Sequence, residues 1–383
     1  MQALHSANSS NWMSQAADLA ALAMAHGNLP HPNPSVGCVL VSSEGLLIGQ
    51  GHTQRAGGPH AEAMALADAN AKGHDVAGAT AYVTLEPCSH HGRTGPCCEA
   101  LIAAGIKKLV AAAADPNPLV SGKGFARMRA EGIEVEVGLG AEGARALNIG
   151  FFSRMIRKRP WVRVKVAASL DGKTALENGQ SQWITGEAAR ADGHAWRARA
   201  GAVLTGIGTV LEDDPQLDVR LVATQRQPLL VVVDSRLQTP LDAKLFLPKR
   251  KVLIYCAIGD AAKKAALEAQ GAEVVLLPGR TGLADKVDLA DMMRDLGARE
   301  INEVHVESGH KLNGSLLREG LIDEWLVYIA PKLIGSGPSL AQFGPITALG
   351  DAQPLVFTDF CRIGPDLRIM AQVFSAADFA KMT

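Results

Sequence analysis

The sequence predicts an α/β protein built from two different domains. Apolar strand-like runs alternate with helical stretches along nearly the whole chain, a pattern typical of a largely parallel or mixed sheet covered on both faces. The 383 residues are enough for two or three domains, and 47% of them are hydrophobic. A basic stretch at 154–160 interrupts the alternation, and we interpret it as a solvated connector rather than a binding patch. The expected domains are 1–155 and 156–383.

Local patterns define the elements of the first domain. An Ala/Leu-rich stretch predicts a helix from Ser14 to a stop at Gly27, preceded by an N-terminal tail that we expect to be frayed. Runs at 36–41 and 46–49 flank Ser-Ser-Glu-Gly and predict a β-hairpin. The remaining expected elements are helices at 60–71, 96–105 and 122–131 and strands at 79–85, 107–112 and 133–137.

The second domain opens with the apolar strand 161–168. Further strands are expected at 202–205, 229–234, 251–256, 273–277, 303–306 and 325–330. Gly138–Gly143 matches the dinucleotide-binding pattern G-x-G-x-x-G, but it follows the last strand of the first domain and lacks a later strand with an acidic end. We therefore do not assign a cofactor to it.

Composition excludes several function classes. Lys plus Arg (38) nearly balances Asp plus Glu (39), and aromatic residues are scarce at 4%, so we expect no nucleic-acid partner. The apolar runs fall far short of the 18 or more residues of a membrane span, and we expect no membrane association. Six cysteines are too few for a disulfide scaffold, and the N-terminus does not resemble a secretory signal, so we expect a cytoplasmic protein.

A metal site is predicted where three of the six cysteines cluster, between positions 88 and 98. His60 opens a predicted helix, Cys88 closes a predicted strand and Cys97 begins the next helix. One imidazole and two thiolates are three of the four ligands of a tetrahedral zinc, and they leave one position open for water. Glu62 lies in the first turn after His60, where we expect it to shuttle protons rather than to bind the metal.

The order of these residues along the chain is more specific for a metal site than any one of them alone. A lone His-x-Glu is common, and Cys97-Cys98 alone is compatible with buried thiols that only pack, which is the role we expect for Cys98. Together the residues follow the pattern of zinc deaminases, with nine rather than three residues from the first cysteine to the second. The intervening loop carries Arg93 and two histidines, which suit an anionic group on a substrate, although a plain solvated loop stays an alternative.

Candidate cofactor segments lie in the second half. A strand, a glycine turn and a helix start at 303–317 place backbone N–H groups where they would cradle a pyrophosphate, although many α/β proteins turn this way for packing alone. Ser235-Arg236 ends a strand and suits the 2′-phosphate of NADP. The turn 206–215 supplies two carboxylates, Asp213 and Asp214, which fit either a functional role or simple capping before Pro215.

These segments resemble the bifunctional riboflavin-biosynthesis deaminase/reductase family over essentially the whole chain. The deaminase half is matched by 32–39, 84–94, 96–98 and 114–118, and the reductase half by 165–174, 181–185, 209–215 and 328–335. The resemblance implies a cytidine-deaminase-like three-layer α/β/α domain followed by a dihydrofolate-reductase-like α/β domain. One departure is Thr53, which stands where the family often has a phosphate-contacting histidine, with His52 beside it.

The resemblance also implies residue roles and two cofactors, Zn²⁺ and NADPH. Catalysis falls to Glu62 and Asp213, and zinc to His60, Cys88 and Cys97. Substrate contacts are implied for Asn33, Arg93, Ser181, Arg197, Leu217, Arg220 and Glu307. NADPH contacts are implied for Ala167, Trp183, Thr209, Asp213, Ser235, Gly309, His310, Lys311, Leu312, Asn313, Gly314 and Ser315.

The implied function is two consecutive steps of riboflavin synthesis. The first domain removes the 2-amino group of 2,5-diamino-6-(5-phosphoribosylamino)pyrimidin-4-one, and the second uses NADPH to reduce the ribosyl group, giving 5-amino-6-(5-phosphoribitylamino)uracil. The family also implies a homo-oligomer. Two alternatives stay open at this point: a zinc deaminase of another base with a non-catalytic C-terminal domain, and a nucleotide-binding regulatory protein with a structural zinc.

Overall fold

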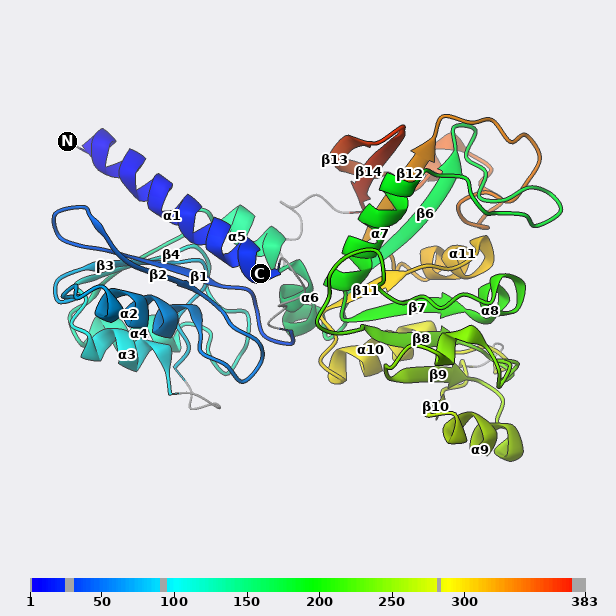
Figure 1. The fold of residues 1–383 in the computed structure, drawn as a ribbon, viewed down its shortest axis with the longest axis horizontal. Coiled ribbons are helices and arrows are strands. Elements are labelled where there is room, and N and C mark those ends of the chain that lie inside the picture. Colours follow the sequence, from blue (N-terminus) through cyan, green and yellow to red (C-terminus); the bar gives the residue numbers. More distant parts are fainter. Residues whose placement is uncertain (1, 25–30, 90–94, 281–283, 374–383) are drawn as a thin grey trace. The chain divides into compact units, whose positions relative to one another are not determined.

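A computed structural model describes residues 2–24, 31–89, 95–280 and 284–373, and side chains from residue 8 onward. The chain divides after Arg157 into two compact units, each with its own sheet (Figure 1). Among the described residues, no helix combines the length and the apolar character that a membrane span requires.

The first unit is built on a mixed five-stranded sheet in the order β2-β1-β3-β4-β5. Strand β1 pairs antiparallel with both β2 and β3, whereas β3, β4 and β5 run parallel. The strands are β1 (Gly37–Val41), β2 (Leu47–His52), β3 (Thr80–Val83), β4 (Lys108–Ala111) and β5 (Glu134–Val137). The hairpin and the mixed sheet expected from the sequence are present.

Helices cover both faces of this sheet, so the expected α/β/α layering is confirmed (Figure 1). One face carries α2 (Ala61–Ala71), α3 (Cys97–Ala103) and α4 (Lys123–Ala130). The other carries α1 (Gln2–Met24) and α5 (Ala141–Leu147), and α6 (Ile149–Arg157) ends the unit. Met13 and Ala16 of α1 pack on Val39, Tyr82 and Val110 of the sheet, which anchors the outer layer.

Two expectations for this unit were wrong. The N-terminal tail is helical from Gln2, because Trp12 packs against the core and the Ser9 hydroxyl lies 3.1 Å from that of Tyr82. The predicted helix end at Gly27 lies outside the described residues. The basic stretch begins as the last turn of α6, where Arg154 donates to the carbonyl of Pro32 at 3.2 Å, so it is not a plain solvated connector.

The glycine pattern at 138–143 forms a turn between β5 and α5. Gly138 and Gly140 adopt φ values of 117° and 76°, which favour glycine. A Cβ atom on Gly140 would lie only 2.9 Å from the Met13 side chain. Local conformation and packing therefore account for these glycines without a nucleotide.

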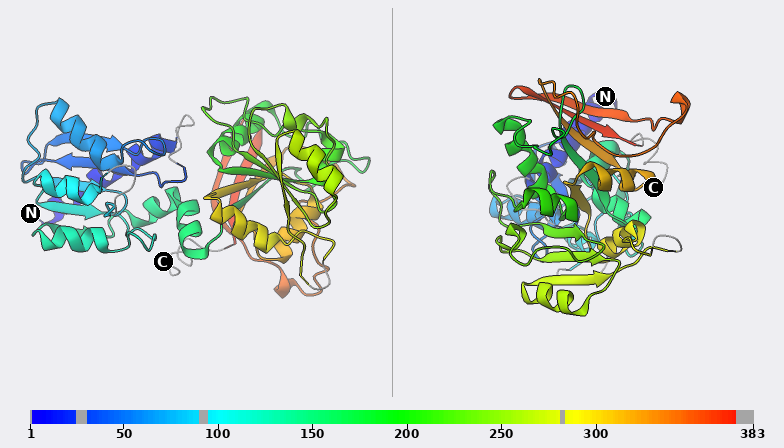
Figure 2. Two further views of the ribbon diagram at one scale, coloured as in Figure 1. Left: turned by 90° about the horizontal axis from the view of Figure 1, so that it is seen from below. Right: turned by 90° about the vertical axis from the view of Figure 1, so that its right-hand side faces the viewer.

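The second unit is built on a nine-stranded sheet in the order β10-β9-β8-β7-β11-β6-β12-β14-β13. The first seven strands of that order run parallel, and β14 and β13 form an antiparallel hairpin at one edge (Figure 2). The strands are β6 (Trp161–Ser169), β7 (Ala202–Gly206), β8 (Leu229–Val233), β9 (Val252–Cys256), β10 (Ala272–Leu276), β11 (Glu303–Val306), β12 (Glu324–Ala330), β13 (Val356–Ile363) and β14 (Asp366–Gln372). The edge hairpin was not among the predicted strands.

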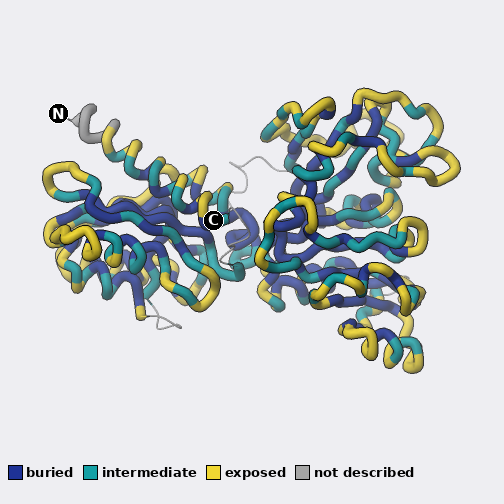
Figure 3. Tube along the Cα trace, viewed as in Figure 1, coloured by how far each residue is buried: buried dark blue, intermediate teal, exposed yellow. Residues whose placement is uncertain are grey.

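Two hydrophobic clusters lie on the opposite faces of this sheet. Along β7, Val203 joins one cluster and Leu204 the other, as the alternation of side chains on a strand requires. The central strands are accordingly buried (Figure 3). The helices are α7 (Glu187–Arg199), α8 (Ile207–Asp213), α9 (Ala261–Ala269), α10 (Leu289–Ala298) and α11 (His310–Arg318), with 3₁₀ turns at Lys244–Phe246 and Leu349–Asp351.

Candidate functional site

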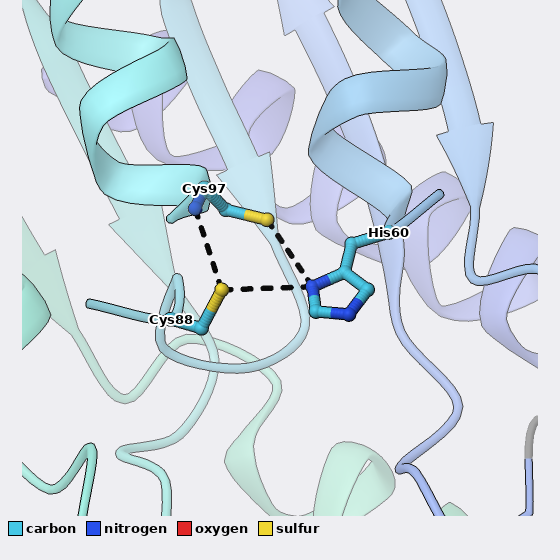
Figure 4. A group of neighbouring side chains, drawn as sticks. All are labelled: His60, Cys88 and Cys97. Atoms are coloured by element: carbon cyan, nitrogen blue, oxygen red, sulfur yellow. Dashed lines mark hydrogen bonds between the residues drawn. The ribbon is translucent and has the colours of Figure 1, made fainter. Parts of the chain in front are cut away.

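Three predicted metal ligands come together in the first unit. His60 is the residue that caps α2, Cys88 follows the loop after β3, and Cys97 is the first residue of α3 (Figure 4). The Nδ1 atom of His60 lies 3.6 Å from the Cys88 sulfur and 3.3 Å from the Cys97 sulfur. The three ligand atoms all lie within 4.8 Å of one another.

This donor set fits zinc. One imidazole nitrogen and two sulfurs are typical zinc ligands, and three protein ligands leave one position for a further group. Hydrogen bonds from the Cys97 thiol and the His60 ring hold the pKa of Cys88 below its ordinary value, which favours the thiolate that a metal requires. Cys98 is buried and its N–H donates to the Cys88 carbonyl at 3.1 Å, and it is not part of the cluster.

Glu62 lies in the first turn of α2, beside the cluster. Its side chain is buried, and burial followed by the nearby Cys88 charge raises its pKa to about 7. A bound metal cation would act in the opposite direction. A buried carboxylate beside the ligand set is placed to accept and release a proton.

Glu86 holds the loop that follows β4 and was not identified from the sequence. Its carboxylate accepts four backbone N–H groups, from Asp115, Gly122, Gly124 and Phe125, at 2.9–3.3 Å. Its only signal in the sequence is its position two residues before Cys88. The loop packs directly on that segment, since a Cβ atom on Gly124 would lie 2.2 Å from the Pro87 carbonyl oxygen.

Asp115 lies in the same loop. It is buried, and burial followed by the Glu86 and Cys88 charges raises its pKa to about 7. Its carboxylate accepts the N–H of Asn117 at 2.8 Å. This end of the sheet therefore gathers several acidic groups beside the ligand set.

The remaining residues predicted for the deaminase site lie in three different segments. Asn33 is half-buried in the segment that precedes β1. The hydroxyl of buried Thr53 is engaged with the backbone of Val36, accepting its N–H at 3.1 Å, and His52 lies beside the Gln54 side chain. The Thr53 hydroxyl thus fixes the start of β1 against the end of β2. Arg93 lies outside the described residues.

In the second unit, Arg197 and Glu307 form a paired ionic contact. The Arg197 Nε and Nη2 atoms donate to the two carboxylate oxygens at 2.6 and 3.0 Å, and Nη1 donates to the Asp218 carbonyl. Burial raises the pKa of Glu307, but Arg197, His305 and Lys165 outweigh burial and hold that pKa well below its ordinary value. Lys165, whose Nζ is 3.8 Å from Glu307, was not singled out from the sequence.

Side chains distant in sequence hold the segment that contains Leu217. Its φ of 52° is unusual for a non-glycine residue and needs support from the surroundings. Arg250 supplies part of that support by donating to the Leu217 carbonyl at 2.5 Å and to the Gln216 carbonyl. The Gln227 amide pairs with both backbone groups of Val219, at 2.8 and 2.9 Å.

His194 holds the end of this segment. Its Nδ1 atom accepts the backbone N–H of Arg220 at 3.1 Å. Burial, followed by the charges of Arg197 and Arg220, lowers the pKa of His194 to about 4, so the ring stays neutral and able to accept. The Arg220 side chain is exposed and pairs with Asp218. Like Gln227 and Arg250, His194 carries no local sequence signal.

The predicted catalytic Asp213 is the last residue of α8. The Ser181 hydroxyl lies 3.5 Å from its carboxylate, so the structure brings these two predicted residues together. Burial and the charge of Glu212 raise the pKa of Asp213. Asp214 instead accepts the backbone N–H of Lys244 at 2.8 Å and has a structural role.

Most of the predicted NADPH residues directly follow β7, β8 or β11 in the chain. Thr209 lies in the first turn of α8, and Gly309 caps α11, close enough that a Cβ atom on Gly309 would lie 3.9 Å from the Thr209 hydroxyl. A Cβ atom on Gly206 would lie 3.1 Å from Leu312, so the beginnings of the two helices are neighbours. The expected turn 309–315 is the start of helix α11: Gly309 and the first helical turn place backbone N–H groups at a helix N-terminus that suits a pyrophosphate, whereas Asn313 and Gly314 are buried in the helix.

The other predicted cofactor contacts lie on separate elements. Ser235 follows β8 and its hydroxyl accepts the Val287 N–H at 3.3 Å, whereas exposed Arg236 pairs with Asp285 at 3.4 Å. Ala167 lies on β6. Trp183 is 61% exposed, with the Arg190 guanidinium 4.6 Å from its ring centre. An exposed aromatic ring of this size is available to a ligand.

Comparison with known proteins identifies the family. Residues 160–369 match the RibD C-terminal domain, and residues 10–113 match the cytidine and deoxycytidylate deaminase zinc-binding region. This chain belongs to the RibD family. The riboflavin biosynthesis protein RibD of Aquifex aeolicus is 44% identical over 82% of this chain and 85% of its own length, and that of Escherichia coli is 42% identical over 88% and 92%.

Solved structures agree with the RibD assignment over both units. Acinetobacter baumannii RibD superposes with a TM-score of 0.83 at 40% identity, covering 95% of this chain and 98% of that one. A diaminohydroxyphosphoribosylaminopyrimidine deaminase/5-amino-6-(5-phosphoribosylamino)uracil reductase from Thermotoga maritima superposes with a TM-score of 0.84 at 32% identity, covering 96% and 99%. The expected fold class, with a cytidine-deaminase-like and a dihydrofolate-reductase-like domain, is confirmed.

RibD membership also decides between the functions left open by the sequence. The chain is a riboflavin-biosynthesis enzyme with a deaminase domain and a reductase domain, and its cofactors are Zn²⁺ and NADPH. A structural zinc in a regulatory protein does not fit this result, nor does a C-terminal domain without catalysis.

Proposed function

We propose that this chain deaminates 2,5-diamino-6-(5-phosphoribosylamino)pyrimidin-4-one in its first domain and reduces the ribosyl group of the product in its second. The observation that carries the first step is the convergence of His60, Cys88 and Cys97 beside a buried Glu62. We place the division between the activities at 155 and 156. The separation of compact units after Arg157 and the reductase match from residue 160 support this division.

In the deaminase, His60, Cys88 and Cys97 would hold zinc, which would supply the Lewis acid for the hydrolysis at C2 of the ring. Glu62 accepts a proton from the attacking water and delivers it to the 2-amino nitrogen, which leaves as ammonia. Asn33 hydrogen-bonds the pyrimidine, and Arg93 meets its phosphate. The second water proton ends on the ring nitrogen beside the new carbonyl, so the net reaction consumes one water and replaces the C–NH₂ group with a carbonyl.

In the reductase, NADPH supplies the hydride that converts the ribosyl group to ribityl. Asp213 carries a raised pKa, which favours its protonated form, and it provides a proton to the opened sugar with Ser181 beside it. We assign the substrate phosphate to Arg197 and Arg220: Arg197 also donates to Glu307 and to the Asp218 carbonyl, and the exposed Arg220 side chain pairs with Asp218. Leu217 and Glu307 complete the substrate contacts.

A paired assay tests both steps. Zinc-loaded protein is mixed with the diamino substrate, and ammonia and NADPH are followed together. We expect ammonia without NADPH, and NADPH loss in a one-to-one ratio to deaminated product when the cofactor is present. Ammonia without any NADPH consumption would refute the second step for this substrate. The absence of both ammonia and NADPH consumption would refute the substrate assignment.

We also propose a cytoplasmic homo-oligomer without a nucleic-acid partner. Six free cysteines, two of them metal ligands, suit a reducing compartment. The edge strand β13 exposes Phe357 and Phe360 by 72% and 78%, and an exposed apolar edge is suited to association. Sedimentation of the wild-type chain and of a Phe357→Ser/Phe360→Ser variant tests this interface, and an unchanged mass would refute its use. Sedimentation in the presence of RNA tests the expectation that there is no nucleic-acid partner, and we expect the molecular mass to stay unchanged.

A further inference from the structure

The segment that carries Asn33 has no regular structure of its own. Residues 31–36 precede β1 and form neither helix nor strand. An irregular segment keeps a defined conformation only when other groups satisfy its backbone. The conformation of Asn33 therefore depends on the groups that bind its neighbours.

Asn148 binds both backbone groups of Ser35. Its Oδ1 atom accepts the Ser35 N–H at 2.7 Å, and its Nδ2 atom donates to the Ser35 carbonyl at 2.8 Å and to the Ala144 carbonyl at 3.2 Å. Only 5% of Asn148 is exposed. The amide thus pairs with one backbone N–H and one C=O as a neighbouring strand would. Because these groups are buried, breaking each bond would cost free energy of folding.

The other side of Asn33 is held from the same part of the chain. Arg154, six residues after Asn148 and on α6, donates to the Pro32 carbonyl at 3.2 Å. Asn33 therefore lies between two backbone anchors that both come from 148–154. Fixing the residues on either side of a contact lowers the conformational entropy lost when the contact forms.

The same segment is tied to the strand end that leads to the metal ligands. The Gly37 N–H donates to the Thr84 hydroxyl at 3.1 Å, and the Thr84 N–H donates to the Gly37 carbonyl at 3.1 Å. Thr84 lies four residues before Cys88. The anchors at Pro32 and Ser35 therefore act on a segment that already abuts the ligand-bearing end of β3.

We propose that Asn148 is a positioning residue for the deaminase, which holds Ser35 so that Asn33 is aimed at the pyrimidine, with Arg154 as the second anchor. The proposal rests on the proposed contact of Asn33 with the substrate. It extends the deaminase site to the junction of α5 and α6, 113 residues from Ser35 in the chain. No metal ligand or reacting group is involved.

A double-mutant cycle on the full-length, zinc-loaded chain tests the proposal. Ammonia release is measured for Asn33→Ala, Asn148→Ala and the double variant. Loss of one hydrogen bond to the substrate predicts that Asn33→Ala lowers kcat/KM by about tenfold or more, chiefly through KM. Asn148→Ala should lower it by about three- to tenfold, and the double variant should resemble Asn33→Ala because both changes act through one contact.

Three controls separate positioning from loss of fold. NADPH consumption with deaminated substrate, measured on the same variant chains, should stay within about twofold of wild type, and zinc content should be unchanged. Ser35→Ala removes the 2.6 Å bond from the Ser35 hydroxyl to the Ala20 carbonyl but keeps both bonds to Asn148, so it should lower the melting temperature without raising KM. Arg154→Met, which removes the outer anchor, should raise KM in the same direction as Asn148→Ala.

The outcomes distinguish the two claims. If the effects of Asn33→Ala and Asn148→Ala on kcat/KM multiply, the contact of Asn33 stands and the positioning role is overturned. If Asn33→Ala leaves ammonia release unchanged, the proposed substrate contact fails and the positioning role fails with it. If Asn148→Ala does not fold, Arg154→Met decides, and an unchanged KM in that variant overturns the proposal.

Discussion

Glu86→Gln is expected to lower the stability of the deaminase unit more than a Glu→Gln substitution at its surface. The Glu86 carboxylate is 4% exposed and accepts two N–H groups on each oxygen, from Asp115 and Gly122 on one and from Gly124 and Phe125 on the other. Glutamine keeps one oxygen and replaces the other with an amide NH₂. Two backbone donors then lose their acceptor and face another donor.

The magnitude follows from these two bonds. A hydrogen bond to a charged group contributes about 1.5–3 kcal/mol, so the loss of two corresponds to about 3–5 kcal/mol after some relaxation of the loop. That is a large share of the roughly 5–15 kcal/mol that stabilises a domain. For a unit of this size we expect the melting temperature to fall by roughly 10 °C. Because the loop packs on Pro87, the affinity of Cys88 for zinc should fall as well.

Residual activity after heating measures this effect for each unit separately. Ammonia release should be lost at a lower temperature in Glu86→Gln, whereas NADPH consumption should be lost at the wild-type temperature, and a colorimetric chelator should extract zinc faster. Glu99→Gln is the matched control, since Glu99 is half-exposed and pairs with Arg127 on the surface, where ion pairs contribute about 0–1 kcal/mol. Equal losses in the two variants would refute the reasoning.

Three further predictions test other parts of the two sites. Glu62→Gln should lower the rate of ammonia release by about 10²–10⁴-fold and leave reduction of deaminated substrate intact, and equal damage to both activities would contradict two separate sites. The folded pKa of His194 (about 4) lies below its ordinary 6.5, so the unfolded chain binds the proton more readily and the reductase unit should lose stability as the pH falls from about 6.5 to 4. His194→Gln should flatten that slope in urea unfolding, and an unchanged slope would exclude His194 as its source. Arg236→Ala should raise KM for NADPH by about tenfold without affecting NADH, and equal changes for both cofactors would remove Arg236 from the 2′-phosphate site.

The sequence predicts best where local pattern and local structure coincide. The apolar runs that become β6, β7, β8, β9, β11 and β12 are largely buried in the sheet, and that burial is why a simple apolar run identifies them. The β13–β14 hairpin escapes prediction because no residue of β13 is buried, so its sequence carries no apolar run like those of the central strands. The start of α1 escapes it for a related reason: Ser and Asn give weak helical signals there, and packing of Trp12 and Met13 on the sheet outweighs them.

The same distinction applies to the candidate sites: some of their residues are predictable from the sequence and others are not. The zinc ligands are visible in the sequence because only a few residue types bind zinc, and each of them lies at the end of a predicted element. The residues that hold the site in place have no such restriction. Glu86 and Gln227 each bind backbone groups, and every residue of a protein carries these. The local sequence therefore does not indicate which side chain binds which backbone group.

Distance along the chain is what hides these supporting residues. Asn148 binds Ser35 across 113 residues, Arg250 binds Leu217 across 33 and His194 binds Arg220 across 26. In each case a polar side chain that is buried or half-buried, with no signal in its own segment, satisfies the backbone of an irregular segment that carries a proposed substrate contact. Such segments cannot satisfy their own backbone groups, so they require a polar side chain from elsewhere. A buried polar residue whose partners are all backbone atoms of a site segment is therefore evidence for a positioning role, and both units supply it independently.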